Sequence, residues 1–210
     1  FNNQEYKYDY IILAVGARTK FFSNILGLKE YGYGIKALHR AMYFKQKFEM
    51  SLFKKLDQGG RYCEPLTIVI AGGGLSGVEI AAQMASFARD FYKNNNFICR
   101  KLNIVLINSG DEILKGVDKK LVRQSQHHLD KLGVITITNQ KVTEITKDKV
   151  TLSDGDIIMM DYMIFAGGIE PNGLIHKLSI SKNLFGYIEV NDYLQSTQYS
   201  DVYAIGDCTT

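Results

Sequence analysis

The sequence predicts an α/β protein built on a parallel sheet. Short apolar runs of strand length recur along the chain, and segments with helical periodicity separate them. A glycine-rich turn joins one such run, residues 66–71 (LTIVIA), directly to a helical segment at residues 75–93. Alternation of strands and helices is typical of parallel sheets with helical crossovers.

The predicted elements extend over the whole chain. Residues 8–15 (YDYIILAV) predict a buried strand closed by Gly16, and a loop rich in glycine and aromatic residues reaches about residue 34. From about residue 37 to 56, apolar residues recur at helical spacing between Lys and Glu, which predicts an amphipathic helix. Further strands are predicted at 66–71, 102–107, 134–138, 161–166, 187–190 and 201–205, and helices at 75–93 and 118–132.

The pattern changes between residues 141 and 160. Residues 141–147, 149–152 and 157–160 are short alternating runs, and residues 153–156 (SDGD) predict a turn between two of them. We therefore expect an antiparallel β-meander in place of one crossover helix, inserted into a Rossmann-like parallel sheet.

Composition narrows the function classes. The chain has 210 residues, 46% of them hydrophobic and 22% charged, as in ordinary soluble domains. A net charge of +3 calls for no nucleic-acid partner. Cys63, Cys99 and Cys208 form no CxxC pair, which argues against a disulfide framework and favours a cytoplasmic compartment. No transmembrane or signal segment is visible, and the start at Phe1 without Met suggests a piece of a longer protein.

The turn after residues 66–71 carries the clearest chemical signal. Gly72, Gly73, Gly74, Leu75, Ser76 and Gly77 fit the G-x-G-x-x-G pattern, between a strand and a helix. Gly72 permits the tight turn, Gly74 lets a pyrophosphate approach the backbone, and Gly77 allows close helix–strand packing. The helix N-terminus offers N–H groups and partial positive charge to phosphates. The sequence therefore predicts a dinucleotide site.

Two side chains near this turn bear on the nucleotide. Asn108 stands at the end of the second strand, where an acid usually binds the adenosine ribose. No Arg stands beside it to bind a 2′-phosphate, while Asp111 and Glu112 keep the region acidic, so NADH is favoured over NADPH. Glu79 is expected on the first turn of the helix, where it is either an acid that suits the helix dipole or a functional group beside the dinucleotide.

Four segments together resemble the flavoprotein reductases with two dinucleotide-binding domains, and especially the type II NADH dehydrogenases. The segments are YDYIILAVGAR at 8–18, the loop GGGLSGVE at 72–79, DYMIFAGGIEPN at 161–172 and DVYAIGDC at 201–208.

The resemblance implies roles for several residues. The three motif glycines would hold the NADH pyrophosphate, and Glu79 would be the catalytic candidate near the nicotinamide and the flavin ring. A strand-end turn near the nicotinamide is implied for two glycines. The residues so assigned are Gly167 and Gly168. Asp207, with room provided by Gly206, would bind the ribityl chain of FAD, and Gly16 would lie in the turn that joins the two domains.

The resemblance also implies organisation and activity. Residues 31–178 would be the NADH-binding domain, and residues 1–30 and 179–210 parts of an FAD-binding domain. The implied enzyme passes a hydride from NADH to FAD and reduces quinone. It would be peripheral on the inner face of the cell membrane and attach there through segments outside this chain. A homodimer is one option for its assembly. The alternatives are a dinucleotide-binding module without activity, a ferredoxin or rubredoxin reductase, and a sulfide:quinone reductase.

Overall fold

The computed structural model describes residues 4–57, 65–94 and 102–209. The chain divides into two compact units. The smaller unit comprises Phe1–Lys20 and Ile169–Thr210, and the larger unit comprises Phe21–Gly168. The larger unit both begins and ends before residues 31–178, the range expected from the sequence for the NADH-binding domain. The assignment of the two units to NADH and FAD stays a prediction.

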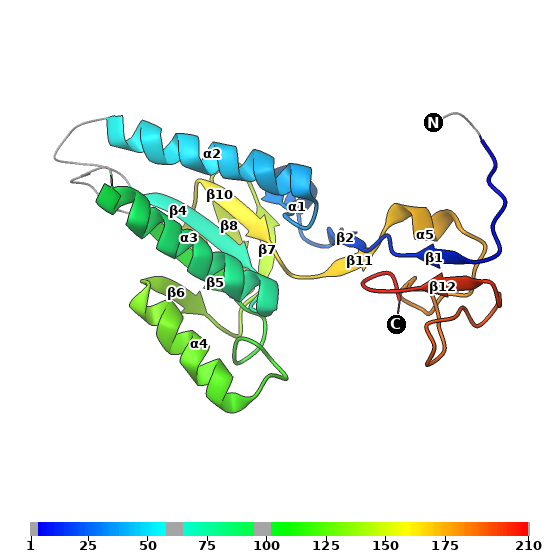
Figure 1. Ribbon diagram of the computed structural model, residues 1–210. Coiled ribbons are helices and arrows are strands. Elements are labelled where there is room, and N and C mark those ends of the chain that lie inside the picture. Colours follow the sequence, from blue (N-terminus) through cyan, green and yellow to red (C-terminus); the bar gives the residue numbers. More distant parts are fainter. Residues whose placement is uncertain (1–3, 58–64, 95–101, 210) are drawn as a thin grey trace. The chain divides into compact units, whose positions relative to one another are not determined.

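The larger unit contains a five-stranded sheet in which every neighbouring pair is parallel (Figure 1). In spatial order its strands are β3 (Gly32–Tyr33), β10 (Tyr162–Phe165), β4 (Leu66–Ala71), β5 (Leu102–Ile107) and β6 (Val134–Ile137). From β4 the chain proceeds outward to β5 and β6, and it then returns to β10 on the other side of β4. The α/β fold class with a Rossmann-like parallel sheet is confirmed.

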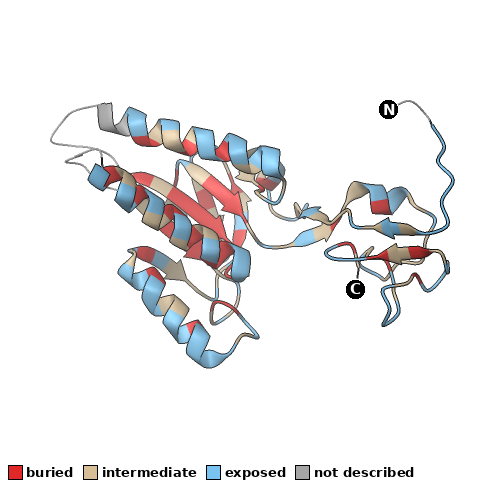
Figure 2. Cartoon of the chain, in the orientation of Figure 1, coloured by how far each residue is buried: buried red, intermediate tan, exposed pale blue. Residues whose placement is uncertain are grey.

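The central strands are apolar on both sides because both faces of the sheet are covered. In β4, Ile68 and Ile70 belong to one core cluster, while Val69 belongs to the other. All three are fully buried, at 0% exposure. Figure 2 shows buried residues concentrated on these strands.

Three helices cover one face of the sheet. They are α2 (Leu38–Asp57), α3 (Leu75–Asn94) and α4 (Lys119–Lys131), and each contributes buried apolar side chains to the first cluster. The Asp118 side chain caps α4 by accepting from the backbone N–H groups of Lys120 and Leu121. Gly133 follows α4 with φ 77°, the left-handed conformation that commonly ends a helix.

The predicted meander covers the opposite face. Strands β7 (Val142–Ile145), β8 (Lys149–Leu152) and β9 (Ile157–Met159) form an antiparallel sheet whose inner side chains join the second cluster. The short helix α1 (Leu28–Tyr31) packs there through Leu28, which is 1% exposed. The crossover from β6 to β10 is thus made by strands, because these short alternating runs bury one apolar side against the main sheet.

The smaller unit has two pairs of strands. β1 (Ile11–Leu13) pairs in parallel with β12 (Val202–Ala204), and β2 (Ala17–Thr19) pairs antiparallel with β11 (Ile169–Pro171). The five-residue helix α5 (Gly173–Lys177) is capped by the Asn172 side chain. A small core gathers Ile175, Ile188, Ala204 and Cys208, each at 0% exposure.

Three predicted segments differ from the structure. Residues 8–15 were expected as a buried strand, but β1 is three residues long and Ile12 is 68% exposed, since β1 pairs with β12 alone among the described residues. The expected loop up to residue 34 contains β2, α1 and β3. Residues 187–190 form isolated bridges and no strand: Ile188 pairs with Lys182 and Thr209, and Val190 with Ser196.

Candidate functional site

Gly72 makes the turn that leaves β4. Its φ of +123° lies in the region that side chains disfavour. A β-carbon there would lie 2.5 Å from the carbonyl carbon and oxygen of Ala166, just after β10. The Gly72 N–H also donates to the Ile107 carbonyl at 2.8 Å. Only glycine therefore allows β4 to turn between its two neighbouring strands.

Gly74 and Gly77 face different surroundings. A β-carbon on Gly77 would lie 1.7 Å from the Gly72 carbonyl oxygen, so α3 touches the turn there. A β-carbon on Gly74 would meet no heavy atom within 4 Å. Gly74 is exposed at the residue before α3, together with Leu75 and Ser76 in its first turn. This arrangement leaves an open approach to the helix N-terminus, where N–H groups lack intrahelical partners and attract anions.

Gly73 is buried and fixes the loop from the other side. Its carbonyl accepts from the Leu114 N–H at 2.7 Å, and a β-carbon there would come within 2.6 Å of the Asn108 side chain. The glycine turn is thereby held by the segment after β5. It is pre-organised, so a ligand would bind it without ordering it first.

A cleft of about 330 Å³ opens at the carboxyl edge of the sheet, next to this turn. This is the point where the strand order reverses between β10 and β4, and open α/β sheets bind ligands at such points. Its apolar walls come from β4, β5, β10 and the start of β7. The lining residues are Phe22, Asn24, Ile25, Ala71, Gly72, Ile107, Ser109, Gln140, Lys141, Val142, Phe165 and Gly167.

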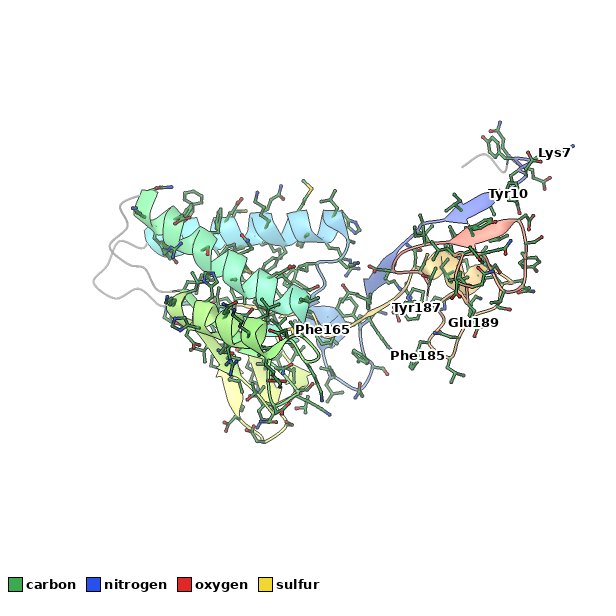
Figure 3. All side chains as sticks on the ribbon, turned by 60° about the horizontal axis from the view of Figure 1, so that its bottom comes forward. Lys7, Tyr10, Phe165, Phe185, Tyr187 and Glu189 are labelled. Atoms are coloured by element: carbon green, nitrogen blue, oxygen red, sulfur yellow. The ribbon has the colours of Figure 1, made fainter. Side chains whose placement is uncertain are left out.

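Gly167 follows β10 at one end of the cleft. A β-carbon there would lie 2.5 Å from the ring of Phe165, which is labelled in Figure 3 at the end of β10. That ring also packs edge-on against Phe22, with ring centroids 5.9 Å apart. Gly168 lies beside the same Phe22 ring, 3.6 Å from a built β-carbon. Glycine at these positions makes room for two aromatic rings, a role that the local sequence does not predict.

The Asn108 side chain makes two hydrogen bonds that the sequence did not predict. Its side-chain nitrogen Nδ2 donates to the carbonyls of Gly110 at 3.2 Å and Glu112 at 2.6 Å. Both amide hydrogens are thus used to hold the loop after β5, and the side-chain oxygen remains the group suited to a ribose hydroxyl. The Glu112 carboxylate is paired with Lys119.

Glu79 was expected on the first turn of the helix, but α3 begins at Leu75 and its first turn contains no acid. Glu79 is the fifth residue of α3, because the helix starts directly after Gly74. The side chain is exposed and is separate from the residues that line the cleft.

The remaining candidates lie in the smaller unit, at one edge of the β1–β12 pair. Gly16 follows β1 with φ +64°, and Gly206 follows β12 with φ +78°; a β-carbon on either would meet no atom within 4 Å. Asp207 is exposed after Gly206. Cys208 anchors this turn, since its Sγ donates to the Leu13 and Ile205 carbonyls, each at 3.3 Å. The parallel pairing brings both glycine turns to the same carboxyl edge.

Sequence reasoning missed several residues of the cleft. Phe22 and Ile25 come from a segment expected to be loop, and Gln140 and Lys141 follow β6 without any recognised motif. The signal available was topological: residues that follow parallel strands gather at one edge of a sheet.

Within the part of the chain that the structure describes, no group of His, Cys, Asp and Glu could hold a metal ion. No described helix is long and apolar enough to cross a membrane. Cys208 is a free, buried cysteine, and Cys63 and Cys99 lie outside the described residues.

A family model described as "Pyridine nucleotide-disulphide oxidoreductase" matches residues 2–210. The chain belongs to this family. Membership agrees with the resemblance drawn from the four segments.

Two curated relatives of this chain carry names of dehydrogenases or reductases. "Probable NADH dehydrogenase" of Dictyostelium discoideum is 31% identical over 217 residues, which are 99% of this chain and 48% of that protein. "Demethylphylloquinone reductase NdbB" of Synechocystis is 32% identical over 203 residues, covering 95% of this chain and 46% of that protein. The chain spans about half the length of the curated relatives it matches.

One solved structure has a fold similar to that of this chain. It is NDH2 from Plasmodium falciparum in complex with NADH, with a TM-score of 0.80 and 26% identity. The match covers 96% of this chain and 44% of the NDH2 chain.

Proposed function

We propose that this chain is the NADH-binding portion of an FAD-dependent NADH dehydrogenase that passes a hydride from NADH to flavin and then electrons to quinone. The observation that carries the proposal is the geometry of the glycine turn. Gly72 and Gly77 are confined by backbone atoms, while Gly74 opens onto the N-terminus of α3. That combination suits a pyrophosphate, because the phosphates need close backbone approach and free N–H groups.

We assign the larger unit to NADH. The pyrophosphate would lie at Gly74, Leu75 and Ser76, and the adenosine ribose beside Asn108. The nicotinamide would lie toward Gly167 and Gly168, which follow β10 at the same edge of the sheet. The aromatic and apolar walls of the cleft would exclude water from the nicotinamide end.

We assign the smaller unit to part of the FAD site. Asp207 is an exposed carboxylate after a left-handed Gly206, and a carboxylate can accept hydrogen bonds from the ribityl hydroxyls. Gly16 leaves open backbone at the neighbouring strand end. When bound, the flavin would supply the redox chemistry, and the residues of this chain would supply binding and orientation.

Glu79 is the proposed catalytic residue. It is exposed on the second turn of α3, one helical turn after Leu75 at the helix N-terminus. A carboxylate there can accept a hydrogen bond from a nicotinamide carboxamide or orient the ring. Substitution of Glu79 by Gln would keep the shape and remove the charge.

The acceptor and location are proposals for the protein that contains this chain. A quinone acceptor is favoured because relatives carry the names NADH dehydrogenase and demethylphylloquinone reductase. We place the protein in the cytoplasm, peripheral on the inner face of the cell membrane, with a homodimer as one option for its assembly.

Calorimetric titration of the purified chain with NADH tests the proposed site. Saturable binding supports it, and absence of binding by a chain with intact far-ultraviolet circular dichroism would overturn it. The alternative, a binding module without activity, is tested by flavin absorbance. A flavin spectrum that NADH bleaches and a soluble quinone restores would support the enzyme, whereas NADH binding without flavin would support the module.

A further inference from the structure

A groove of about 370 Å³ lies beside α2 and the start of β10, two elements that lie side by side in Figure 1. Tyr162, the first residue of β10, lines this groove, whereas Phe165 at the other end of the strand lines the cleft beside the glycine turn. The groove and the cleft share none of their described lining residues. The described lining of the groove consists of Tyr43, Gln46, Lys47, Met50, Ser51, Lys54 and Tyr162.

The α2 residues of the groove form one stripe along the helix. They recur at spacings of three and four residues, which places them on the same helical face. Lys47 and Lys54 lie about one helical turn on either side of Ser51. Because a lysine stem is long and flexible, both ammonium groups can reach a ligand held beside Ser51. The stripe therefore offers two positive charges to one position.

Two aromatic rings hold the Lys47 side chain in place. Its Nζ lies 4.9 Å from the ring centroid of Tyr43 and 5.9 Å from that of Tyr33, and it donates to the Tyr33 hydroxyl at 3.4 Å. Hydrogen bonds to Tyr43 and then Tyr33 raise the pKa of Lys47. An ammonium group has three hydrogens, so Lys47 stays charged and keeps one donor for a ligand.

Ser51 and Tyr162 share a hydrogen bond whose direction a ligand can set. Their hydroxyl oxygens lie 2.7 Å apart, and either can be the donor. When Tyr162 donates to Ser51, the Ser51 hydrogen is available to a ligand. In the opposite order Tyr162 donates to the Lys47 carbonyl, 3.5 Å away, which is long for a hydrogen bond. An anion beside Ser51 favours the first order, since it accepts hydrogen bonds.

The described lining of the groove contains no carboxylate. Glu49, on another face of α2, pairs with Lys45 at 3.7 Å, and both residues line a different cavity. Asp161 lies outside the lining, and its carboxylate accepts from the Thr67 N–H at 2.8 Å. The charge that the lining presents to a ligand is therefore positive.

We propose that this groove binds a phosphorylated small molecule, with the phosphate held by Lys47, Lys54 and Ser51. Ammonium groups and a hydroxyl donor suit a phosphate, which offers three acceptor oxygens and up to two negative charges. Tyr43 and Met50, which are 54% and 57% exposed, would contact the organic part of the ligand. The volume of the groove lies in the range of small-molecule sites. The inference is independent of the assignment of the glycine turn to NADH.

Titration of the purified chain, followed in ¹H–¹⁵N correlation spectra, tests both the binding and its location. The probes are inorganic phosphate and glycerol 3-phosphate, with acetate as an anion of another shape. Both phosphates should give saturable shifts at the Ser51 and Tyr162 amides, with acetate weaker by at least about fivefold. Lys47→Gln and Lys54→Gln should each weaken phosphate by about three- to fivefold. Lys45→Gln is the matched control, because this lysine lies on the same helix outside the groove.

The location of the shifts decides between the groove and the glycine turn. Shifts confined to Gly74 and Ser76 would place phosphate at the helix N-terminus of α3 and overturn the inference, as would a folded chain without saturable shifts at Ser51. Equal losses in Lys45→Gln and Lys47→Gln would also overturn it, because any lysine of α2 would then serve. Loss in Lys47→Gln with unchanged binding by Lys45→Gln supports it.

Vesicles distinguish a lipid phosphate from a free one. Phosphatidylcholine vesicles with and without phosphatidic acid are sedimented with the chain. Glycerol 3-phosphate binding with no extra sedimentation by phosphatidic acid supports a small molecule as the ligand. Sedimentation that depends on phosphatidic acid and on Lys47, without binding of glycerol 3-phosphate, would overturn that choice.

Discussion

Gly77 packs so closely on Gly72 that a β-carbon at Gly77 would lie 1.7 Å from the Gly72 carbonyl oxygen. This contact joins the first turn of α3 to the end of β4, and both elements belong to the first core cluster. The glycine turn is thus part of the folded core of the larger unit. Substitutions at its glycines can therefore separate effects on NADH binding from effects on the stability of the fold.

Gly77→Ala should destabilise the larger unit. Alanine in place of glycine stabilises a helix by about 1 kcal/mol, but overpacking against the backbone costs about 1–3 kcal/mol or more. The clash therefore outweighs the gain in helix propensity. Thermal unfolding followed by far-ultraviolet circular dichroism measures the loss. Gly74→Ala is the control, because its β-carbon would meet open space; equal melting temperatures for the two variants would contradict this account.

Gly74→Val should lose NADH and keep the fold. The side chain enters the space that a pyrophosphate would occupy, and beyond the two neighbouring residues no heavy atom of the protein lies within 4 Å of its β-carbon. We expect NADH affinity to fall by more than about tenfold, while the melting temperature changes little. Calorimetry and thermal unfolding measure the two effects. NADH binding as tight as in wild type would show that the nucleotide approaches elsewhere.

Asn108→Asp should weaken NADH binding even though aspartate is the usual ribose ligand. A carboxylate cannot donate to the Gly110 and Glu112 carbonyls, which would then face a negative charge. We expect a loss of stability of about 1–3 kcal/mol and a looser loop after β5. Asn139→Asp is the control, because it introduces the same charge beside the same loop and leaves the side-chain hydrogen bonds of Asn108 in place. Tighter NADH binding by Asn108→Asp would refute the prediction.

Tyr92→Phe should reduce the decrease in the free energy of unfolding that occurs as the pH becomes alkaline. Burial raises the pKa of Tyr92 above its usual 10.0, and the residue is 6% exposed. Above that pH the unfolded chain releases the phenol proton more readily than the folded chain, so stability falls as pH rises. Lys47, whose pKa is raised by hydrogen bonds to Tyr43 and then Tyr33, acts in the same direction in both proteins.

Urea denaturation at a pH of about 8 and of about 10.5 measures this difference. Wild type should lose more stability than Tyr92→Phe between the two conditions. Tyr6→Phe, at a residue that is 79% exposed, should behave as wild type. An equal loss in wild type and Tyr92→Phe would mean that Tyr92 does not titrate differently on unfolding.

The sequence by itself determined the elements whose chemistry is local. The apolar β-branched run and the helical periodicity predict a strand at residues 66–71 and a helix at residues 75–93, and the structure has β4 at Leu66–Ala71 and α3 at Leu75–Asn94. The spacing of the glycine loop between them is typical of a strand–turn–helix unit. The alternating runs after β6 likewise predicted the meander, because one apolar side must be buried.

Tertiary structure decided what depends on pairing between distant segments. Gly32–Tyr33 becomes the edge strand β3 through its pairing with β10, and nothing in its own two residues predicts that. The two hydrogens of the Asn108 amide go to loop carbonyls that only the folded chain presents. Lys141 reaches the cleft because β6 ends beside β5. Local sequence sets conformation and burial pattern, while the charge and shape of the cleft arise where strand ends meet.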